Sequence, residues 1–283
     1  MYYLSRPSKI QIYVNSGRKT AAQIKKELEA QHGGEVLLIN AGLFDGYFKP
    51  CCWLKVDGTV LHTEAWHRFG YGIVGNSLVM DTSANIAKYS DYIQCVELIR
   101  DGKKEYPLSY PAEMGGTRGR TAIGVKADGQ VLAFCVKDGT GGSLGEFRTD
   151  RAYSAGSVVW HDDDTYKFTK YKNAGPWDNS VVVQYDVCMT PEQLRDKLFR
   201  MGCVSAIMLD GGGSSQCIMP TGTITSSRIV YTFIAIWISK ETQVANPQTP
   251  APSCADGTKN ACKYRPPCGY CAKYYKRCPL VEE

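Results

Sequence analysis

Apolar runs of strand length dominate the first 240 residues of this chain. Residues 9–14 alternate between polar and apolar side chains, which is typical of a half-buried strand. Residues 35–40 and 204–209 are almost continuously apolar, as in strands that are buried on both faces. Tight hairpin turns are predicted at three Asp-Gly pairs, which begin at Asp57, Asp101 and Asp128. The pattern therefore predicts a domain built mainly of strands.

Two segments carry the signals of a helix start. Thr20 with Gln23, and likewise Thr190 with Gln193, have the spacing of a capping box. Apolar residues then recur on one face of each segment, and glycines follow, with Gly202 ending the second one. We therefore expect an α+β fold, with a mixed, strand-rich sheet core and a few helices.

The composition changes after residue 240. Residues 241–253 are rich in proline and threonine and lack hydrophobic periodicity, which predicts a linker between a domain of residues 1–240 and a module of residues 254–283. Five of the 12 cysteines lie in this module, which is too short to bury a core and needs disulfides or a metal. The ligands of a structural zinc would be Cys262, Cys268, Cys271 and Cys278. The spacing leaves zinc and disulfides both open.

The overall composition is that of a globular protein. Of the 283 residues, 22% are charged and 43% are hydrophobic, which argues against a disordered chain. The net charge of +5 is spread along the chain, so nucleic acid is not expected to be the main partner. We find neither a signal peptide nor the roughly 20 apolar residues of a membrane span. We expect a cytoplasmic protein, or one released with a phage lysis product, and the oligomeric state stays open.

The strand at residues 204–209 runs directly into an acidic, glycine-rich loop, Asp-Gly-Gly-Gly-Ser-Ser-Gln. Successive glycines cost backbone entropy, about 0.5–1 kcal/mol each relative to alanine in regular structure, and close approach to a ligand is a common reason for them. Backbone amides and hydroxyls in such a loop form a cradle for an anion. The expected cradle consists of Gly211, Gly212, Gly213, Ser214 and Ser215. Asp210, at the end of the strand, is a candidate acid, base or orienting carboxylate.

Three segments, in this order, resemble signatures of the phosphodiester glycosidase family. Residues 39–44 resemble its Asn-Gly-Gly-Phe-Phe element, and residues 120–124 its Arg-Thr-Ala-Ile-Gly element, which Asp138 follows after a hairpin. Residues 189–216 resemble its last signature, and the likeness extends over residues 9–240.

The resemblance implies a hydrolase that cleaves the glycosidic bond of a sugar-1-phosphodiester. The substrate would be an N-acetylglucosamine-1-phosphodiester, a nucleotide sugar, a cell-wall polymer or a modified nucleotide. Apart from the possible structural zinc no cofactor is expected, and a metal requirement of the main domain stays open. Two alternatives stay open: a module with this fold that binds a glycan or phosphate without catalysis, and a component of a virion or cell surface.

The chemistry of this reaction assigns roles to individual residues. Arg120 is expected to hold the phosphate, because a guanidinium binds phosphate with two parallel hydrogen bonds. Asp210 is expected to be the catalytic carboxylate, with Asp138 as the second one. Asp45 and Glu113 are weaker alternatives. The matching signatures also imply contacts to the substrate from Asn40, Gly42 and Thr121.

The sequence also departs from the family pattern. Ala41 and Leu43 replace a glycine and a phenylalanine that the family commonly has, and Thr140 follows Asp138-Gly139 where arginine is frequent. Residues 140–190 are longer than the compact pattern requires. An insertion beside a site is a natural place for substrate selection.

Other polar groups give weaker signals. His62 and His67 have the residue type of metal ligands, but no third ligand is implied. Residues 162–164 form an acidic run that is typical of a solvated loop. Ser214 lacks the Gly-x-Ser-x-Gly context of a serine hydrolase. We expect none of these groups to carry the activity.

Overall fold

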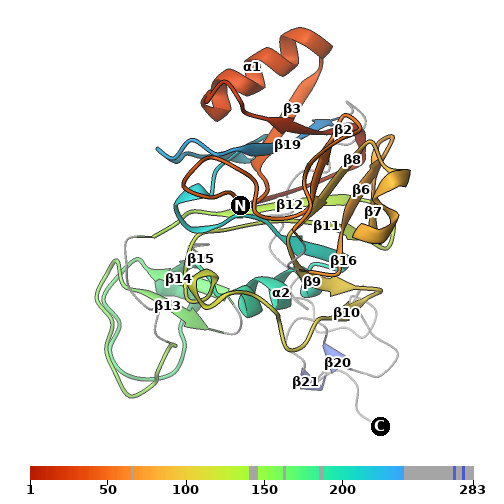
Figure 1. The fold of residues 1–283 in the computed structure, drawn as a ribbon. Coiled ribbons are helices and arrows are strands. Elements are labelled where there is room, and N and C mark those ends of the chain that lie inside the picture. Colours follow the sequence, from red (N-terminus) through yellow and green to blue (C-terminus); the bar gives the residue numbers. More distant parts are fainter. Residues whose placement is uncertain are drawn as a thin grey trace, which may run out of the picture. The chain divides into compact units, whose positions relative to one another are not determined.

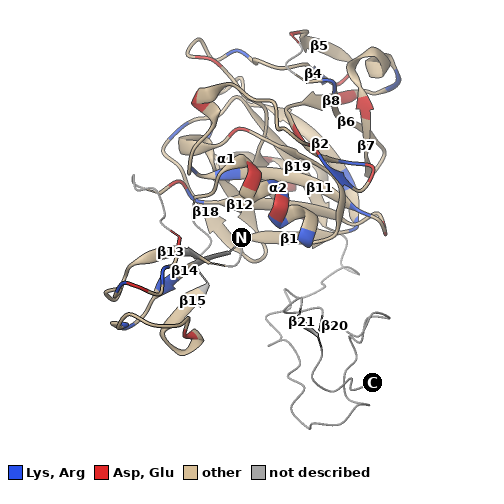
Figure 2. Cartoon of the chain, turned by 90° about the horizontal axis from the view of Figure 1, so that it is seen from below, with Lys and Arg blue, Asp and Glu red and all other residues tan. Residues whose placement is uncertain are grey.

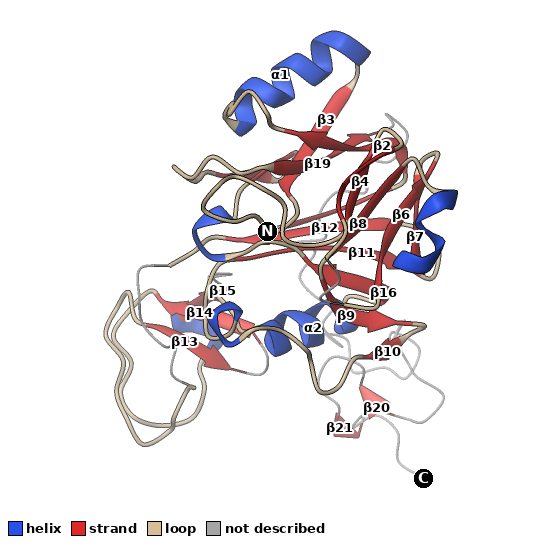
Figure 3. Ribbon diagram, viewed as in Figure 1, coloured by secondary structure: helices blue, strands red, loops and turns tan. Residues whose placement is uncertain are grey.

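The computed structural model describes residues 1–64, 67–139, 146–161, 164–184 and 188–238, together with the backbone of residues 270–271 and 276–277. This part of the chain is mostly β with a few helices, as expected from the sequence (Figure 1, Figure 3). The chain divides into two compact units, Met1–Gln243 and Val244–Glu283.

Little of the second unit is described. It contains a two-stranded antiparallel ladder of β20 (Tyr270–Cys271) and β21 (Lys276–Arg277). The predicted linker at residues 241–253 and the thiols of Cys262, Cys268, Cys271 and Cys278 lie outside the described residues. The choice between zinc and disulfides therefore stays a prediction.

A six-stranded sheet in the first unit carries most of the strands that lead to the site. Its order is β1-β12-β11-β16-β9-β10. Its strands are β1 (Tyr2–Ser5), β9 (Val96–Arg100), β10 (Lys103–Lys104), β11 (Arg120–Lys126), β12 (Val131–Val136) and β16 (Cys203–Met208). Two of the predicted Asp-Gly turns join β9 to β10 and β11 to β12. These two hairpin predictions are confirmed.

Two five-stranded sheets complete the main body. The first has the order β18-β17-β3-β19-β2 and the second the order β5-β4-β8-β6-β7. The strands of the first are β2 (Pro7–Val14), β3 (Glu35–Asn40), β17 (Cys217–Met219), β18 (Gly222–Ile224) and β19 (Thr232–Ile238). Those of the second are β4 (Leu54–Val56), β5 (Thr59–His62), β6 (Phe69–Val74), β7 (Ser77–Thr82) and β8 (Asp91–Gln94). The third predicted Asp-Gly turn joins β4 to β5.

All strand pairs among the described residues are antiparallel, so the expectation of a mixed sheet is wrong. Continuous apolar runs are common in parallel sheets, whose faces are both covered. Here β3 and β16 are apolar for the same physical reason, although their neighbours run antiparallel. Both faces of each strand pack against other elements.

The layers around these strands explain that burial. Side chains from the inner faces of all three large sheets form one core, which includes Ile39, Ile93 and Ile207. Helix α2 (Pro191–Arg200) covers the outer face of the six-stranded sheet, and its buried Leu194 packs there. Helix α1 (Ala21–His32) covers the outer face of β3 and β19 with its buried Ile24 (Figure 1).

Both helices begin where the sequence predicts. The Thr20 and Gln23 side chains form a complete capping box at α1, and those of Thr190 and Gln193 form one at α2. Gly202 follows α2 with a φ of 85°, a conformation that glycine adopts without steric cost. The described residues also contain four short 3-10 helices: η1 (Ser83–Lys88), η2 (Ala112–Met114), η3 (Asn179–Val181) and η4 (Gly212–Ser214).

The predicted insertion contains a small sheet of its own. Its strands are β13 (Val158–His161), β14 (Asp164–Phe168) and β15 (Val182–Gln184). A separate cluster of aromatic side chains packs here, in which the Tyr153 and Phe168 rings stack with their centroids 4.8 Å apart. The insertion therefore has its own small core.

Charged residues of both signs are interspersed over the described part of the chain (Figure 2). No helix in that part combines the length and the apolar character that a membrane crossing requires.

Antiparallel pairing brings three chain segments to one edge of the six-stranded sheet. Arg120 at the start of β11 pairs with Val136 at the end of β12, and Ala122 pairs with Met208 at the end of β16. The residues that follow β12 and β16 therefore emerge beside the residues that precede β11. Asp138 and Asp210 are each the second residue beyond their strand.

Candidate active site

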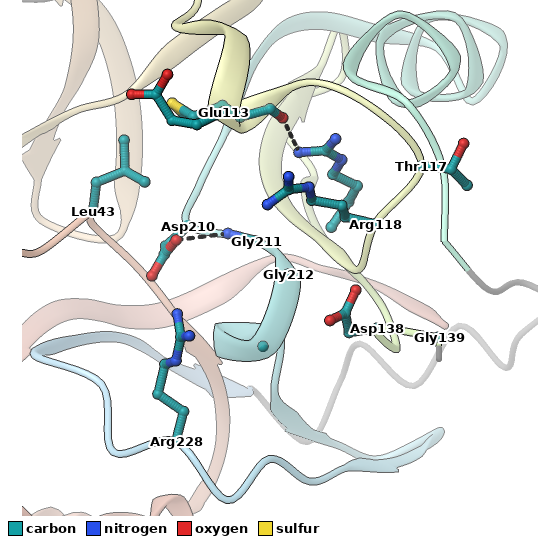
Figure 4. Close-up of a pocket in the computed structure, with 13 residues that line it drawn as sticks. Leu43, Glu113, Thr117, Arg118, Asp138, Gly139, Asp210, Gly211, Gly212 and Arg228 are labelled. Atoms are coloured by element: carbon teal, nitrogen blue, oxygen red, sulfur yellow. Dashed lines mark hydrogen bonds between the residues drawn. The ribbon is translucent and has the colours of Figure 1, made fainter. Parts of the chain in front are cut away.

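A cavity of about 510 Å³ opens at this sheet edge (Figure 4). It is lined by Leu43, Glu113, Met114, Thr117, Arg118, Arg120, Asp138, Gly139, Asp210, Gly211, Gly212, Gly213 and Arg228. Its size is in the range of pockets that bind small molecules. Three carboxylates and three guanidinium groups are among the 13 lining residues.

Asp210 is the most perturbed carboxylate of the cavity. Burial raises its pKa from 3.8 to about 6, against the opposing effects of the Ser214 hydroxyl, the Gly211 amide and the charge of Arg228. The Gly211 amide donates to Oδ1 over 2.9 Å. A carboxyl group with a pKa near neutrality can exchange protons with a substrate or water at physiological pH.

The backbone amides of the glycine-rich loop donate hydrogen bonds within the protein. The N–H groups of Gly212, Ser214 and Ser215 donate to carbonyls of Gly119, Gly211 and Gly212, and that of Gly211 donates to Asp210. Ser214 and Ser215 are buried, and neither lines the cavity. Four of the five amides of the predicted anion cradle therefore already have internal acceptors, although Gly211, Gly212 and Gly213 line the cavity.

The three glycines lie against three arginine side chains. A Cβ atom on Gly211 would lie 3.6 Å from a terminal nitrogen of Arg120, and one on Gly212 would lie 4.0 Å from Cδ of Arg118. On Gly213 it would lie 3.5 Å from the guanidinium carbon of Arg228. These are ordinary contact distances, so the arginines do not require the glycines. Gly211 is required by the Gly119 carbonyl oxygen, which would lie 2.7 Å from such a Cβ, and Gly212 by its φ of 58°.

Arg120 does not have the geometry of a phosphate clamp. Its side chain is only 2% exposed, and Nε donates to the Met189 carbonyl over 2.8 Å. The two terminal nitrogens donate to the carbonyls of Met114 and Gly116 over 2.8 and 2.6 Å. Burial, with a smaller effect from the charge of Arg118, lowers its pKa to about 10. The clamp assignment is therefore corrected: Arg120 positions the loop before β11.

Arg118 and Arg228 are exposed guanidinium groups that the sequence analysis missed. Among the described residues neither forms an ion pair with a carboxylate, and the side-chain contact of Arg228 is a 3.3 Å hydrogen bond to Ser214 Oγ. Arg118 precedes Arg120 by two residues, a spacing that puts both on one side of an extended segment, and this signal could have identified it. Arg228 lies between β18 and β19, where the sequence gives no such signal.

The backbone around Arg228 is firmly held. Ser226 Oγ donates to the Gly213 carbonyl and accepts from the Arg228 amide, the latter over 2.9 Å. The Gln216 side chain donates to the Arg228 carbonyl over 3.0 Å. An exposed arginine on a fixed backbone loses less entropy when it binds an anion, because only its side chain has to be ordered.

Asp138 faces the cavity from the other side of the glycine loop. In Figure 4 the backbone of Gly211 and Gly212 runs between Asp138 on one side and Asp210 and Arg228 on the other. Asp138 Oδ1 accepts a 2.7 Å hydrogen bond from the Gly119 amide, which fixes the carboxylate and leaves its second oxygen for other contacts.

Asn40 and Thr121 act inside the protein, contrary to the expectation that they bind substrate. Both are fully buried. The side-chain Nδ2 of Asn40 donates to the Asp210 carbonyl over 2.7 Å. Its Oδ1 accepts from Thr121 Oγ1 over 2.6 Å and from the backbone amide of Gln216 over 3.0 Å. The backbone amide of Gly42 also has an internal acceptor, because it donates to Thr232 Oγ1 over 2.9 Å. Asn40 therefore positions Asp210.

The other carboxylates considered have different surroundings. Glu113 lines the rim of the cavity on the side of Leu43 (Figure 4). Asp45 accepts from the amides of Tyr47 and Lys49, both over 2.9 Å, and is a turn residue away from the lining. No group of three or more potential metal ligands occurs within the described residues.

Comparison with known proteins gives a remote structural relationship. No protein-family model and no curated protein sequence matches the chain. The catalytic domain of zebrafish N-acetylglucosamine-1-phosphodiester alpha-N-acetylglucosaminidase, auto-inhibited by its pro-peptide, is similar with a TM-score of 0.51 at 16% identity, over 82% of this chain and 73% of that chain. A protein from Synechocystis is similar with a TM-score of 0.47 at 10% identity, over 84% of this chain and 59% of that chain. At these identities the first likeness shows a shared fold.

Proposed function

We propose that this protein is a hydrolase that cleaves the bond between a sugar's anomeric carbon and a phosphodiester. One observation carries the proposal: Asp210, with its raised pKa, shares a cavity with two exposed arginines that form no ion pair with a carboxylate among the described residues. Unpaired guanidinium groups favour an anionic substrate, and a tuned carboxylate favours proton transfer beside it. The shared fold with a phosphodiester glycosidase domain supports the same reaction class.

The leaving group decides how the arginines act. When the bond between the anomeric carbon and the phosphate oxygen breaks, the electron pair leaves with the oxygen, and negative charge builds up on the phosphate. A guanidinium aimed at that charge stabilises the transition state more than the ground state. Arg228, beside Asp210, is the group that we assign to this phosphate.

The carboxylate completes the reaction. Water attacks the anomeric carbon and gives a proton to Asp210, which returns it to solvent after the products leave. A phosphodiester is a weakly basic leaving group, so it departs without a strong acid. Asp138, across the glycine loop, is placed to hold the sugar or the water. The products are the free sugar and a phosphate monoester.

Substrate selection is assigned to the insertion after Gly139. Hydrogen bonds join its two ends at the cavity wall. The Gly139 amide donates to Cys188 Sγ over 2.7 Å, and the Cys188 amide donates to the Lys137 carbonyl over 3.3 Å. Gly139 itself lines the cavity. A segment that leaves and rejoins the domain here can contact the part of a substrate that extends beyond the site.

The test is release of free sugar from a panel of sugar-1-phosphodiesters, including UDP-N-acetylglucosamine. Asp210→Asn keeps an oxygen that accepts from Gly211 but cannot take up a proton, so sugar release should fall by at least about a hundredfold. Asp45→Asn is the matched control, because Asp45 also accepts two backbone amides and lies outside the cavity. Full activity of Asp210→Asn would show that another group acts on water. If wild-type protein binds the panel without releasing sugar, a binding module is the better description.

A further inference from the structure

Two cysteines lie just beyond the ladder of β4 and β8, which are neighbouring antiparallel strands (Figure 3). The ladder continues past the start of β4, because the Gln94 amide donates to the Trp53 carbonyl over 2.9 Å. The next step of the same register places Cys52 opposite Cys95. Since Trp53 and Gln94 occupy a hydrogen-bonded position, the two cysteines occupy a non-hydrogen-bonded one, where opposite side chains are closer together.

This placement has the geometry of a disulfide. Cα atoms of a non-hydrogen-bonded pair are about 4.5 Å apart, and disulfides join Cα atoms that are about 4.4–6.8 Å apart. Side chains of directly opposite residues point to the same face of the sheet, and both thiols are buried there. A hydrogen bond with the Cys52 thiol, followed by burial, raises the pKa of Cys95. The two sulfur atoms are therefore in contact.

The pair lies at the base of the loop that carries Leu43, a residue of the cavity wall. The Cys51 amide donates to the Leu43 carbonyl over 2.9 Å, so the residue next to Cys52 closes this loop. Cys95 lies between β8 and β9, where the chain passes from a five-stranded sheet into the six-stranded one. A covalent bond between the two cysteines would hold the loop on the junction of these sheets.

This junction is close to the carboxylate of the candidate site. Besides the hydrogen bond with Cys52 and burial, the charge of Asp210 contributes to the raised pKa of Cys95. Burial raises the pKa of the half-buried Cys51, again with a smaller contribution from Asp210. A bond formed between the buried thiols would therefore stiffen the protein beside Asp210.

We propose that Cys52 and Cys95 form a disulfide, with a small disulfide such as oxidised glutathione as the oxidant, and that this bond holds the Leu43 loop in place. Cys52 lies beyond the end of β4, where local opening exposes a side chain without unfolding the sheet. Its thiolate attacks one sulfur of glutathione disulfide, and one glutathione leaves. The Cys95 thiolate then attacks Cys52 Sγ and releases the second glutathione, so the two thiols lose two protons and two electrons in all. This step is independent of the proposed hydrolysis.

The test is peptide mapping of the full-length protein without reduction. The folded protein is equilibrated with oxidised glutathione, the remaining thiols are blocked with N-ethylmaleimide, and the protein is digested with trypsin. Mass spectrometry should find the peptide of Cys52 linked to the peptide of Cys95, with a mass two hydrogens below the sum of the two. Reduction should separate them. Recovery of both peptides with every thiol blocked would overturn the inference.

Two variants identify the cysteine that is linked, because Cys51 and Cys52 share a tryptic peptide. Cys51→Ser is the matched control and should keep the link to Cys95. Cys52→Ser should abolish it. A link that persists in Cys52→Ser and disappears in Cys51→Ser would assign the bond to the neighbouring residue and contradict the register argument.

Two further measurements report whether the bond holds the loop. Oxidation should raise the midpoint of thermal unfolding of the wild-type protein by about 4–16 °C, and Cys52→Ser should lose this difference. Amide hydrogen exchange of residues 43–51 should slow on oxidation, while that of α1 stays unchanged. A linked protein with the midpoint and the exchange rates of the reduced form would refute the holding role.

Discussion

Replacing Arg120 with methionine tests whether this residue supports the fold or binds the substrate. The variant removes three hydrogen bonds from a charged donor to backbone carbonyls. Each is worth about 1.5–3 kcal/mol net. The lowered pKa, from 12.5 to about 10, indicates that burying the charge costs about 3 kcal/mol of this gain. We expect Arg120→Met to lower the free energy of unfolding by about 3 kcal/mol.

The assay is urea-induced unfolding of the full-length protein, followed by tryptophan fluorescence. Arg118→Ala is the matched comparison, because its exposed side chain has no hydrogen bond among the described residues, and its effect should stay within about 0.5 kcal/mol. A loss below about 1 kcal/mol in Arg120→Met, together with abolished sugar release, would refute the positioning role. That result would favour the original prediction that Arg120 binds the phosphate of the substrate.

Three other perturbations test the site. In Asp210 the native state binds the proton more tightly than the unfolded chain, so the free energy of unfolding should fall as pH rises from 3.8 towards about 6, while sugar release rises as the carboxylate ionises. Asp210→Asn should remove this pH dependence, and its free energy of unfolding at pH 7 should exceed that of wild type by about 1–2 kcal/mol. Gly119→Ala should destabilise by about 1–3 kcal/mol, because its Cβ would lie 2.7 Å from Ser215 Oγ; Gly46→Ala is the control, with nothing within 4 Å. Asn40→Ala should cost about 3 kcal/mol in urea unfolding and reduce kcat more than it changes KM, because it frees the Asp210 carbonyl and leaves buried partners unsatisfied.

Local signals in the sequence predicted much of the fold. The capping boxes at Thr20 and Thr190 and the Asp-Gly turns act over three or four residues, so no tertiary contact is needed to recognise them. Strand positions were also predictable, because burial of one or both faces leaves a period in the sequence. Strand direction was not, since a continuous apolar run reports burial on both faces and says nothing about the neighbour's orientation.

The prediction of the site divides in the same way. Asp210 and Asp138 were predicted as site residues, and the structure places both in the cavity. Asn40 and Thr121 belong to the same signatures, yet they hydrogen-bond within the protein and do not line the cavity. Arg120 lines it, but its guanidinium nitrogens already donate to backbone carbonyls. A motif identifies residues that a site requires, and it does not separate those that contact a ligand from those that hold the contacting residue in place.

The sequence by itself determined the elements, their ends and the acidic glycine loop, because capping, turns and hydrophobic periodicity are properties of neighbouring residues. Only the tertiary structure decided which polar groups face the cavity. Arg228 comes to Asp210 through the packing of the loop before β19 against Gly213, and the guanidinium of Arg120 is held by three backbone carbonyls. Both outcomes depend on contacts between segments that are far apart in the chain or on the exact path of a loop. Burial and hydrogen-bond partners are fixed only when those segments meet.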